Sequence, residues 1–444
     1  MVQTLGKTAE GGTPPWLEEV VRPLNSQAAL AEASRCLYCY NAPCSEACPA
    51  GIGVPDFIRK ISTGNMKGAT RVILQANILG ATCARVCPVD KLCEGACVLG
   101  KVERPVAIGR LQRFVTDWAA EKKVSVVQRG QPVGKQVAVV GAGPAGLACA
   151  TELLKMGYSV TIFEAREKGG GLDTYGIVPF RLPTELSLAE VSVVEGLGAE
   201  IRTETAVGRD VPVEALLENY DAVFVGVGLG KGQPLGIRGE ELAGVYDALD
   251  LLEAVKCGQV DRFALGTTVA VIGGGNTAID AATTAKRLGA EEVMVLYRRS
   301  EQEMPAYRAE LDFARLEGVH FHWLTAPTSI LGETRVEGLE CVKMRLGEPD
   351  ESGRRRPLPI PGSEYRIKAD TVIKAVGQVP VAGIADLLGV KSENGLITVD
   401  PETGSTSNGR IFAGGDCVTG GGEVVYAVQA GKRAAKGIDK LLRG

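Results

Sequence analysis

Two segments of the chain share one pattern of apolar and polar positions. An apolar run from Val137 to Val140 is followed by glycines and then by a helical pattern, and the run from Val269 to Ile272 is followed in the same way. Short apolar runs bounded by glycine are typical of buried strands, and strands that alternate with helices predict parallel sheets. Because the repeat is as long as a domain, we expect two α/β units rather than a solenoid.

The part of the chain before these units has helical spacing instead. Segment 54–75 carries apolar residues at helical intervals, and Ile108 and Leu111 begin another apolar helix face. The polar stretch 122–135 contains glycine and proline and predicts a linker. We therefore expect a helical domain over about residues 28–125, after a mostly irregular extension over residues 1–27.

The first glycine loop has the form that binds a dinucleotide. Gly141, Gly143 and Gly146 follow a strand and open a helix, so the backbone can approach a pyrophosphate at the positive helix end. Glu164 ends the next strand, where an acidic side chain can bind ribose hydroxyls. A glycine turn alone is often only structural. Here the strand, the helix and the acidic residue all occur in the order and at the spacing of a dinucleotide-binding unit.

The second loop repeats this arrangement. Gly273 and Gly275 are followed by Ala278, which is an accepted variant at the third position. Where an NAD site would carry an acid, Arg298 and Arg299 end the second strand. Guanidinium groups suit a ribose 2′-phosphate.

The choice between NADP(H) and NAD(H) stays open on these residues. Arg298 and Arg299 favour NADP(H), and Arg308 lies close enough in the sequence to join them. The alternative is that these arginines are solvated surface charges. Glu301 and Glu303 follow them and could fold back onto the ribose of NAD(H).

A third signal near the end of the chain predicts a flavin. Gly414, Gly415 and Asp416 follow a strand pattern and precede a helix. In flavoproteins with two dinucleotide-binding domains, such a turn places its carboxylate on the flavin, and the following helix points its positive end at the isoalloxazine. We therefore expect an FAD domain in two parts, 134–243 and 372–444, with an NAD(P)-binding domain inserted over 244–371.

Charge and hydropathy exclude several classes of partner. The net charge is −4, from 49 basic and 53 acidic residues, so neither nucleic acid nor an anionic membrane is implied as a partner. The longest apolar stretch is too short and too rich in glycine to span a bilayer. The first residues contain no apolar core of a secretory signal, so we expect a cytoplasmic protein.

Most of the cysteines are concentrated in the helical domain. Of twelve, eight lie within 62 residues: Cys36, Cys39, Cys44, Cys48, Cys83, Cys87, Cys93 and Cys97. In a cytosolic chain this density indicates metal or iron–sulfur ligation, and two Cys-Pro steps are typical of ferredoxin-type clusters. A structural zinc site is the alternative. Iron–sulfur clusters transfer electrons and so have a reason to lie next to a flavin, whereas structural zinc does not. We predict no catalytic cysteine, and core packing for Cys149.

At this point the chain resembles a known family. The segments RCLYCYNAPCSEACP, ATCARVCPVDKLCEGAC, IGRLQRF and YGIVPFRLP resemble the N-terminal half of dihydropyrimidine dehydrogenase, which occurs in bacteria as a separate subunit. The resemblance covers about residues 28–444. It extends to the glutamate synthase small subunit and to related flavin–iron–sulfur transhydrogenase subunits, which tend to carry an acid at the position of Gln112.

The resemblance implies an α/β fold of the two-dinucleotide-binding flavoprotein class, preceded by an α-helical double iron–sulfur domain. It implies two [4Fe–4S] clusters. One would be held by Cys36, Cys39, Cys44 and Cys97, and the other by Cys48, Cys87, Cys93 and Gln112. It leaves Cys83 as a small buried residue without a ligand role.

The implied function is electron input to dihydropyrimidine dehydrogenase. NAD(P)H would reduce FAD, and the two clusters would pass electrons to an FMN-containing partner subunit that reduces uracil or thymine to the 5,6-dihydro form. The alternatives are a subunit for glutamate synthase or a transhydrogenase, and a non-enzymatic iron–sulfur or zinc scaffold, which would contain no flavin.

Overall fold

The computed structural model describes residues 17–350 and 353–444, so predictions that fall on residues 1–16 lie outside the described residues. The chain divides into two compact units. The larger unit comprises residues 19–174, 181–229 and 380–444. The smaller unit comprises residues 230–379 together with 175–180 and the described residues 17–18. Among the described residues, no helix combines the length and the apolar character that crossing a bilayer needs.

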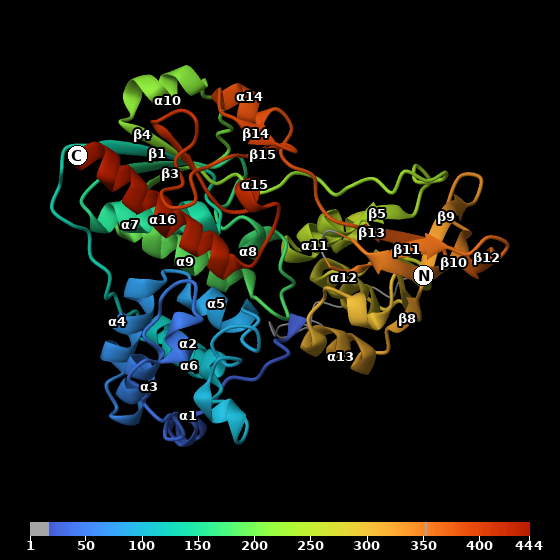
Figure 1. The fold of residues 1–444 in the computed structure, drawn as a ribbon, viewed down its shortest axis with the longest axis horizontal. Coiled ribbons are helices and arrows are strands. Elements are labelled where there is room, and N and C mark those ends of the chain that lie inside the picture. Colours follow the sequence, from blue (N-terminus) through green and yellow to red (C-terminus); the bar gives the residue numbers. More distant parts are fainter. Residues whose placement is uncertain (1–16, 351–352) are drawn as a thin grey trace. The chain divides into compact units, whose positions relative to one another are not determined.

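The larger unit begins with a helical domain that carries the eight clustered cysteines (Figure 1). Its elements are α1 (Ser26–Ala33), α2 (Pro43–Glu46), α3 (Val54–Ser62), α4 (Met66–Ala76), α5 (Gly80–Val86), the 3-10 turn η2 (Val98–Lys101) and α6 (Ile108–Glu121).

The helical pattern predicted over residues 54–75 is broken in the structure. Helix α3 ends at Ser62, and Gly64 follows with a φ of +71°, a conformation that favours glycine. Asn65 then starts α4, because its side-chain oxygen accepts a hydrogen bond from the amide of Gly68 at 2.9 Å. The pattern thus forms two helices that pack against each other.

A parallel sheet with the strand order β16-β4-β1-β2-β3 follows in the larger unit. Its strands and helices are β1 (Gln136–Val140), α7 (Pro144–Lys155), β2 (Ser159–Phe163), α8 (Leu172–Tyr175), α9 (Thr184–Gly196), β3 (Glu200–Arg202), α10 (Val213–Asn219), β4 (Ala222–Val225), α14 (Ile384–Leu388), β14 (Ser392–Glu393), β15 (Leu396–Ile397), β16 (Ile411–Ala413), α15 (Asp416–Thr419) and α16 (Val424–Arg443). The last strand in sequence returns beside β4, as a domain in two parts requires.

The smaller unit contains a second parallel sheet, ordered β5-β13-β6-β7-β8, and an antiparallel sheet of β9 to β12. Its elements are β5 (Val245–Asp247), α11 (Ala248–Lys256), η3 (Val260–Arg262), β6 (Thr268–Gly273), α12 (Asn276–Arg287), β7 (Glu292–Tyr297), η4 (Glu301–Glu303), α13 (Arg308–Leu316), β8 (His320–Trp323), β9 (Thr325–Leu331), β10 (Gly338–Pro349), β11 (Arg355–Pro359), β12 (Tyr365–Lys368) and β13 (Thr371–Ala375).

The predicted boundaries of the inserted domain, residues 244–371, are too narrow. Strand β13 pairs in parallel register with both β5 and β6, so its hydrogen bonds belong to the second sheet. Segments 230–243 and 372–379 therefore fall in the smaller unit. The predicted strand was correct, but the apolar run could not reveal which of two similar sheets it joins.

One apolar core connects the helical domain to the first sheet within the larger unit. It includes Phe57 and Leu111 from the helices and Val137 and Ile438 from the α/β part. A protein core that is continuous across two substructures makes them one packing unit rather than flexibly linked domains.

Two charged side chains, the buried Glu190 and the partly buried Lys432, reinforce this attachment. Glu190 in α9 accepts hydrogen bonds from the backbone amide of Ala81 at 2.8 Å and from the amide and hydroxyl of Thr82. Lys432 in α16 donates to the carbonyls of Ala50 and Ala76. Burial raises the pKa of Glu190 to about 7, although the hydrogen bonds from Ala81 and Thr82 favour the carboxylate and act to lower the pKa.

The raised pKa of Glu190 predicts a pH-dependent stability. A carboxyl whose pKa is raised on folding contributes stability below its unfolded pKa, near 4.5, and that stability is lost as the pH rises through about 7. Glutamine does not ionise, so we expect Glu190→Gln to abolish this pH-dependent decrease in the free energy of unfolding. The decrease is on the order of 3 kcal/mol. The melting temperature of the variant relative to wild type should rise between about pH 5 and pH 8.

The matched control is Glu195→Gln on the same helix, where the side chain is exposed. Its melting temperature should follow wild type across the same pH range. Parallel pH profiles for Glu190→Gln and wild type would contradict the role given to Glu190.

Candidate cofactor sites

Two glycines of the first loop stand where the packing leaves no room for a side chain. Gly141 has a φ of +100°, and a Cβ there would lie 2.5 Å from the carbonyl oxygen of Gly226. A Cβ on Gly146 would lie 1.9 Å from the carbonyl oxygen of Gly141. The turn thereby brings the start of α7 directly behind β1, with the helix amides at the end where a pyrophosphate binds.

Gly143 and Glu164 lie beside this turn. Gly143 precedes α7 without a side-chain cap, and the nearest atom to a Cβ there would be 3.8 Å away, in Gly171. Glu164 is buried, and its carboxylate accepts hydrogen bonds from the amides of Ala142 at 2.8 Å and Arg166 at 2.9 Å. A carboxylate has about four acceptor sites, so two remain for ribose hydroxyls.

The turn at residues 414–416 lies against the first glycine loop. Gly415 has a φ of +78°, and a Cβ there would lie 3.0 Å from the Cβ of Ala145 in α7. Asp416 begins α15, and burial raises the pKa of its carboxyl to about 6, with nearby Glu423 adding to the effect. The first glycine loop and the turn at residues 414–416, which are far apart in the sequence, are therefore neighbours in the larger unit.

These features fit FAD. Gly143 leaves room at the start of α7, because the nearest atom to a Cβ there would be 3.8 Å away. A pyrophosphate matches the helix amides, ribose hydroxyls match Glu164, and hydroxyls of a ribityl chain match the partly buried Asp416.

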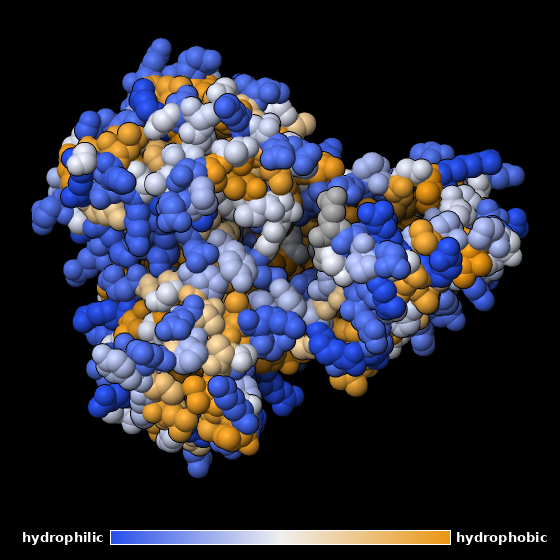
Figure 2. All heavy atoms as spheres, in the orientation of Figure 1, coloured by the Kyte–Doolittle hydropathy of each residue, from blue (hydrophilic) through white to orange (hydrophobic). Residues whose placement is uncertain are grey.

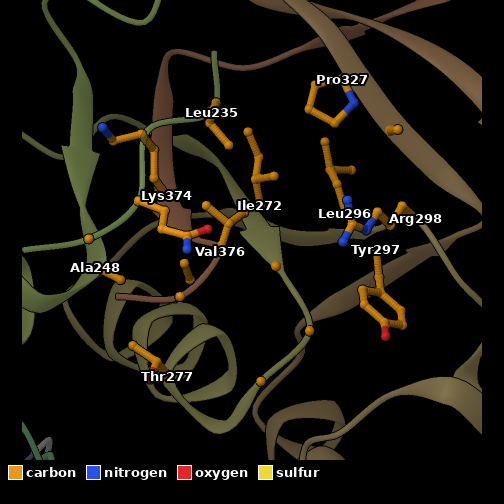
Figure 3. A pocket seen from close by; sticks show the side chains of 18 of the residues that line it. Leu235, Ala248, Ile272, Thr277, Leu296, Tyr297, Arg298, Pro327, Lys374 and Val376 are labelled. Carbon is orange, nitrogen blue, oxygen red and sulfur yellow. The ribbon is translucent and has the colours of Figure 1, made fainter. Parts of the chain in front are cut away.

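The second glycine loop borders a cavity of about 550 Å³ in the smaller unit. Gly273 has a φ of +152°, and a Cβ there would lie 2.2 Å from the carbonyl oxygen of Ala375 and 3.2 Å from Ala278. Gly275 precedes α12 with open space beside it. Figure 3 shows Ile272, Val376 and Thr277 along this cavity. Its size and its glycine-rich edge fit a nicotinamide dinucleotide.

The predicted arginines have different surroundings. Arg298 is exposed and lines the cavity, where Figure 3 labels it next to Tyr297. Arg299 also lines the cavity, but its side chain is buried and held by the carboxylate of Asp350 at 2.6 Å and the carbonyl oxygen of Arg355. Arg308 is not among the lining residues and pairs with Glu301 and Asp312.

The two nearby glutamates are also engaged elsewhere. Glu301 pairs with Arg308 and Arg315, and Glu303 pairs with Arg355. Neither lines the cavity. Of the charged side chains that end the second strand, the exposed Arg298 is thus the one best placed to meet a ligand.

Four thiols of the helical domain form a first group. The pKa of Cys36 is raised by burial and by the neighbouring thiols of Cys39 and Cys97. Burial raises the pKa of Cys44 to about 11, and Cys97 and Cys36 add to the effect. All twelve cysteines are free. Crowded thiols that are not in disulfides fit a set of thiolate ligands.

A second group surrounds a small cavity in the same domain. The cavity is lined by Cys48, Cys87 and Cys93, together with Cys83 and Gln112. The Gln112 side chain is buried, and its amide nitrogen donates to the carbonyl oxygen of Gly80 at 2.7 Å. The amide therefore has a fixed orientation.

The small cavity beside Cys48, Cys87 and Cys93 is also lined by residues that the sequence analysis did not single out. Asn77 lines it from the turn before α5, and Val425 lines it from the first turn of α16. Cys83 lies beside Cys87, whose thiol raises the pKa of Cys83 further together with burial. Asn77 and Val425 belong to no cysteine motif, so only the fold reveals their position.

Among the described residues, no three or more His, Cys, Asp or Glu side chains converge on a position for a single metal ion. Cys48, Cys83, Cys87 and Cys93 line a common cavity. The donor set is soft, as an iron–sulfur cluster requires.

Comparisons with known proteins agree with both parts of the chain. The family described as dihydropyrimidine dehydrogenase domain II, 4Fe-4S cluster, matches residues 15–124, and the pyridine nucleotide-disulphide oxidoreductase family matches residues 135–431. In fold, the chain is similar to FprA from Mycobacterium tuberculosis, with a TM-score of 0.61 and 22% identity over 70% of this chain and 85% of that one.

Two curated relatives match nearly the whole chain. The glutamate synthase [NADPH] small chain of Halomonas elongata is 41% identical over 95% of this chain and 92% of its own length. The NAD-dependent dihydropyrimidine dehydrogenase subunit PreT of Escherichia coli is 38% identical over 97% of this chain and 98% of its own length. The chain therefore belongs to the pyridine nucleotide-disulphide oxidoreductase family, as an NAD(P)H-dependent electron-transfer flavoprotein with an iron–sulfur domain at its N-terminal side.

Proposed function

We propose that this chain is the electron-input subunit of a dihydropyrimidine dehydrogenase. It would take electrons from NAD(P)H and deliver them through FAD and two [4Fe–4S] clusters to an FMN-containing partner subunit. That partner would reduce uracil or thymine to the 5,6-dihydro form. The observation that carries the proposal is the buried Gln112 beside Cys48, Cys87 and Cys93, because the resemblance to dihydropyrimidine dehydrogenase implies a glutamine as the fourth ligand of the second cluster.

The chain's residues would bind and orient the cofactors. Glu164 and the amides at the start of α7 would hold the dinucleotide part of FAD, and Asp416 its ribityl chain. Flavin supplies the ability to accept a hydride and release electrons singly. The thiolates of Cys36, Cys39, Cys44 and Cys97 would hold one cluster. Cys48, Cys87, Cys93 and Gln112 would hold the other.

Helix α16 connects the two kinds of site. Its first turn follows the Asp416 turn, and Val425 in that turn lines the second cysteine cavity. The second cluster would therefore be the one nearer to the flavin, and the first cluster the one from which electrons leave.

The surface over the first cysteine group suits a protein partner. Tyr40 is fully exposed and Leu37 is 58% exposed, on the loop between Cys36 and Cys44. Figure 2 shows apolar side chains on the surface of the helical domain, to which this loop belongs. Exposed apolar side chains beside an electron exit favour a docked redox subunit as their occupant. Relatives are named as a small chain or a subunit, which supports a hetero-oligomer.

A glutamate synthase small chain is the second candidate. The observation in its favour is the 41% identity with the Halomonas protein along almost the entire chain. The helical domain and both dinucleotide sites would serve either role, so the distinction depends on Gln112 and on the partner.

A first prediction separates Gln112 from Cys83 as the fourth ligand. Purified Gln112→Ala should lose about four of about eight irons and retain FAD, because the second cluster would lack a ligand. Cys83→Ala should keep both clusters. Iron and flavin analysis of anaerobically purified protein measures this. Loss of iron in Cys83→Ala together with intact clusters in Gln112→Ala would make Cys83 the ligand and weaken the assignment.

A second prediction concerns the coenzyme. We expect a preference for NADPH that Arg298→Ala reduces by roughly tenfold or more in KM, since a hydrogen bond to a charged group contributes about 1.5–3 kcal/mol. The rate with NADH should change little. Steady-state rates with an artificial acceptor provide the measurement.

Arg308→Ala is the matched control, because this exposed arginine pairs with Glu301 and Asp312 and does not line the cavity. Arg299→Ala should lower stability instead, since it leaves Asp350 without its buried partner. A clear preference for NADH in the unmodified protein would contradict this prediction, and would mean that Arg298 is a surface charge that does not bind the 2′-phosphate.

A third prediction tests the partner. The chain alone should oxidise NAD(P)H with an artificial acceptor but should not reduce uracil. With the purified FMN-containing pyrimidine-reducing subunit, it should form dihydrouracil at the expense of NAD(P)H. Reconstitution of glutamate formation with a glutamate synthase large subunit, and failure with the pyrimidine subunit, would favour the second candidate. Dihydrouracil formation by the chain alone would contradict the proposal.

A further inference from the structure

Asn77 has an unusual position for a polar side chain. It is 1% exposed and lies in the turn between α4 and α5. Its side-chain oxygen accepts a hydrogen bond from the amide of Leu79 at 2.9 Å, which fixes the orientation of the side chain. The side-chain nitrogen, Nδ2, is buried and makes no aligned hydrogen bond within the described residues. A buried donor without a partner destabilises the fold, so a ligand is expected to meet it.

The same side chain lines the second cysteine cavity, with Cys48, Cys87 and Cys93. The thiol of Cys83 lies near the Asn77 amide but is not aligned with it for a hydrogen bond. The unpartnered donor and the cavity are independent observations that indicate one acceptor, a sulfur atom inside the cavity.

We propose that Asn77 Nδ2 donates an N–H···S hydrogen bond to the second iron–sulfur cluster and thereby raises its reduction potential. Asn77 would be a positioning and tuning residue, not a ligand. The inference rests on the second cluster of the proposed function. Hydrogen bonds to cluster sulfurs favour the reduced, more negative form, and they are among the factors that set cluster potentials.

The surroundings of the cavity leave this donor few competitors. Val425 contributes an apolar wall, and the Gln112 nitrogen is already bonded to the carbonyl oxygen of Gly80. Lys432 donates to the carbonyls of Ala50 and Ala76. Among the described lining side chains, Asn77 is thus the amide whose nitrogen has no other hydrogen-bond acceptor, in a place with little water to screen its effect.

The test compares two variants of the full chain with its cofactors. Asn77→Asp keeps the shape and the oxygen that accepts from Leu79, and replaces the donor by a carboxylate oxygen. Asn77→Ala removes both. Redox titration followed by electron paramagnetic resonance gives the potential of each cluster. Measurements at about pH 9 keep the aspartate ionised even if burial raises its pKa.

We expect both variants to shift the second cluster to a more negative potential, by up to about tenfold in its reduction equilibrium, about 59 mV for one electron. The first cluster and FAD should be unaffected. Asn65→Ala is the matched control, because Asn65 also caps a helix of this domain but is exposed. An unchanged second-cluster potential in Asn77→Asp would show that Asn77 only supports its turn, and would overturn the inference.

A measurement on the unmodified protein applies even if the variants do not fold. Pulsed resonance of the reduced protein, with asparagine side chains labelled with nitrogen-15, should detect a coupling between one asparagine nitrogen and the second cluster. Absence of that coupling in protein with both clusters would overturn the inference alone. Iron for one cluster only would instead contradict the proposed function.

Discussion

Two charged side chains, one buried and one partly buried, fix the distance between the cysteine-bearing helices and the first sheet. Glu190 reaches from α9 to the amides at the start of α5, the helix that carries Cys83. Lys432 reaches from α16 to the carbonyls of Ala50, before α3, and Ala76, at the end of α4. Neither contact is a salt bridge, because each charge is met by backbone dipoles. Electron transfer depends on a constant separation between redox groups, and a rigid attachment of this kind provides it.

The same glycine turn between a strand and a helix occurs in both parallel sheets, but the residues around it differ. In both sheets a glycine with positive φ lets a strand turn directly into a helix, at Gly141 and at Gly273. The two sites differ at the end of the next strand, where Glu164 in one is buried against its turn and Arg298 in the other is exposed at a cavity. The fold thus repeats one turn in both sheets, and the side chains that end the next strand give the two places different charge.

Much of this organisation could be predicted from the sequence. The glycine loops, the helical domain and the two-part first α/β unit follow from local patterns, because a glycine turn between a strand and a helix allows few alternatives. The boundaries at 244 and 371 were wrong, since β13 could join either sheet by its apolar pattern. Arg299 looked equivalent to Arg298, but its pairing with Asp350 depends on β10 and β11, far along the chain. Asn77 carries no motif, so its place in the cavity is a property of the fold.

The central claim is that one chain joins an FAD to two one-electron clusters. Anaerobic reductive titration of the purified chain, followed by absorbance and paramagnetic resonance, tests it most directly. We expect about four electrons per chain, two for the flavin and one for each cluster, with two distinct cluster signals. Uptake of only about two electrons, with bleaching of the flavin and no cluster signal, would contradict the claim.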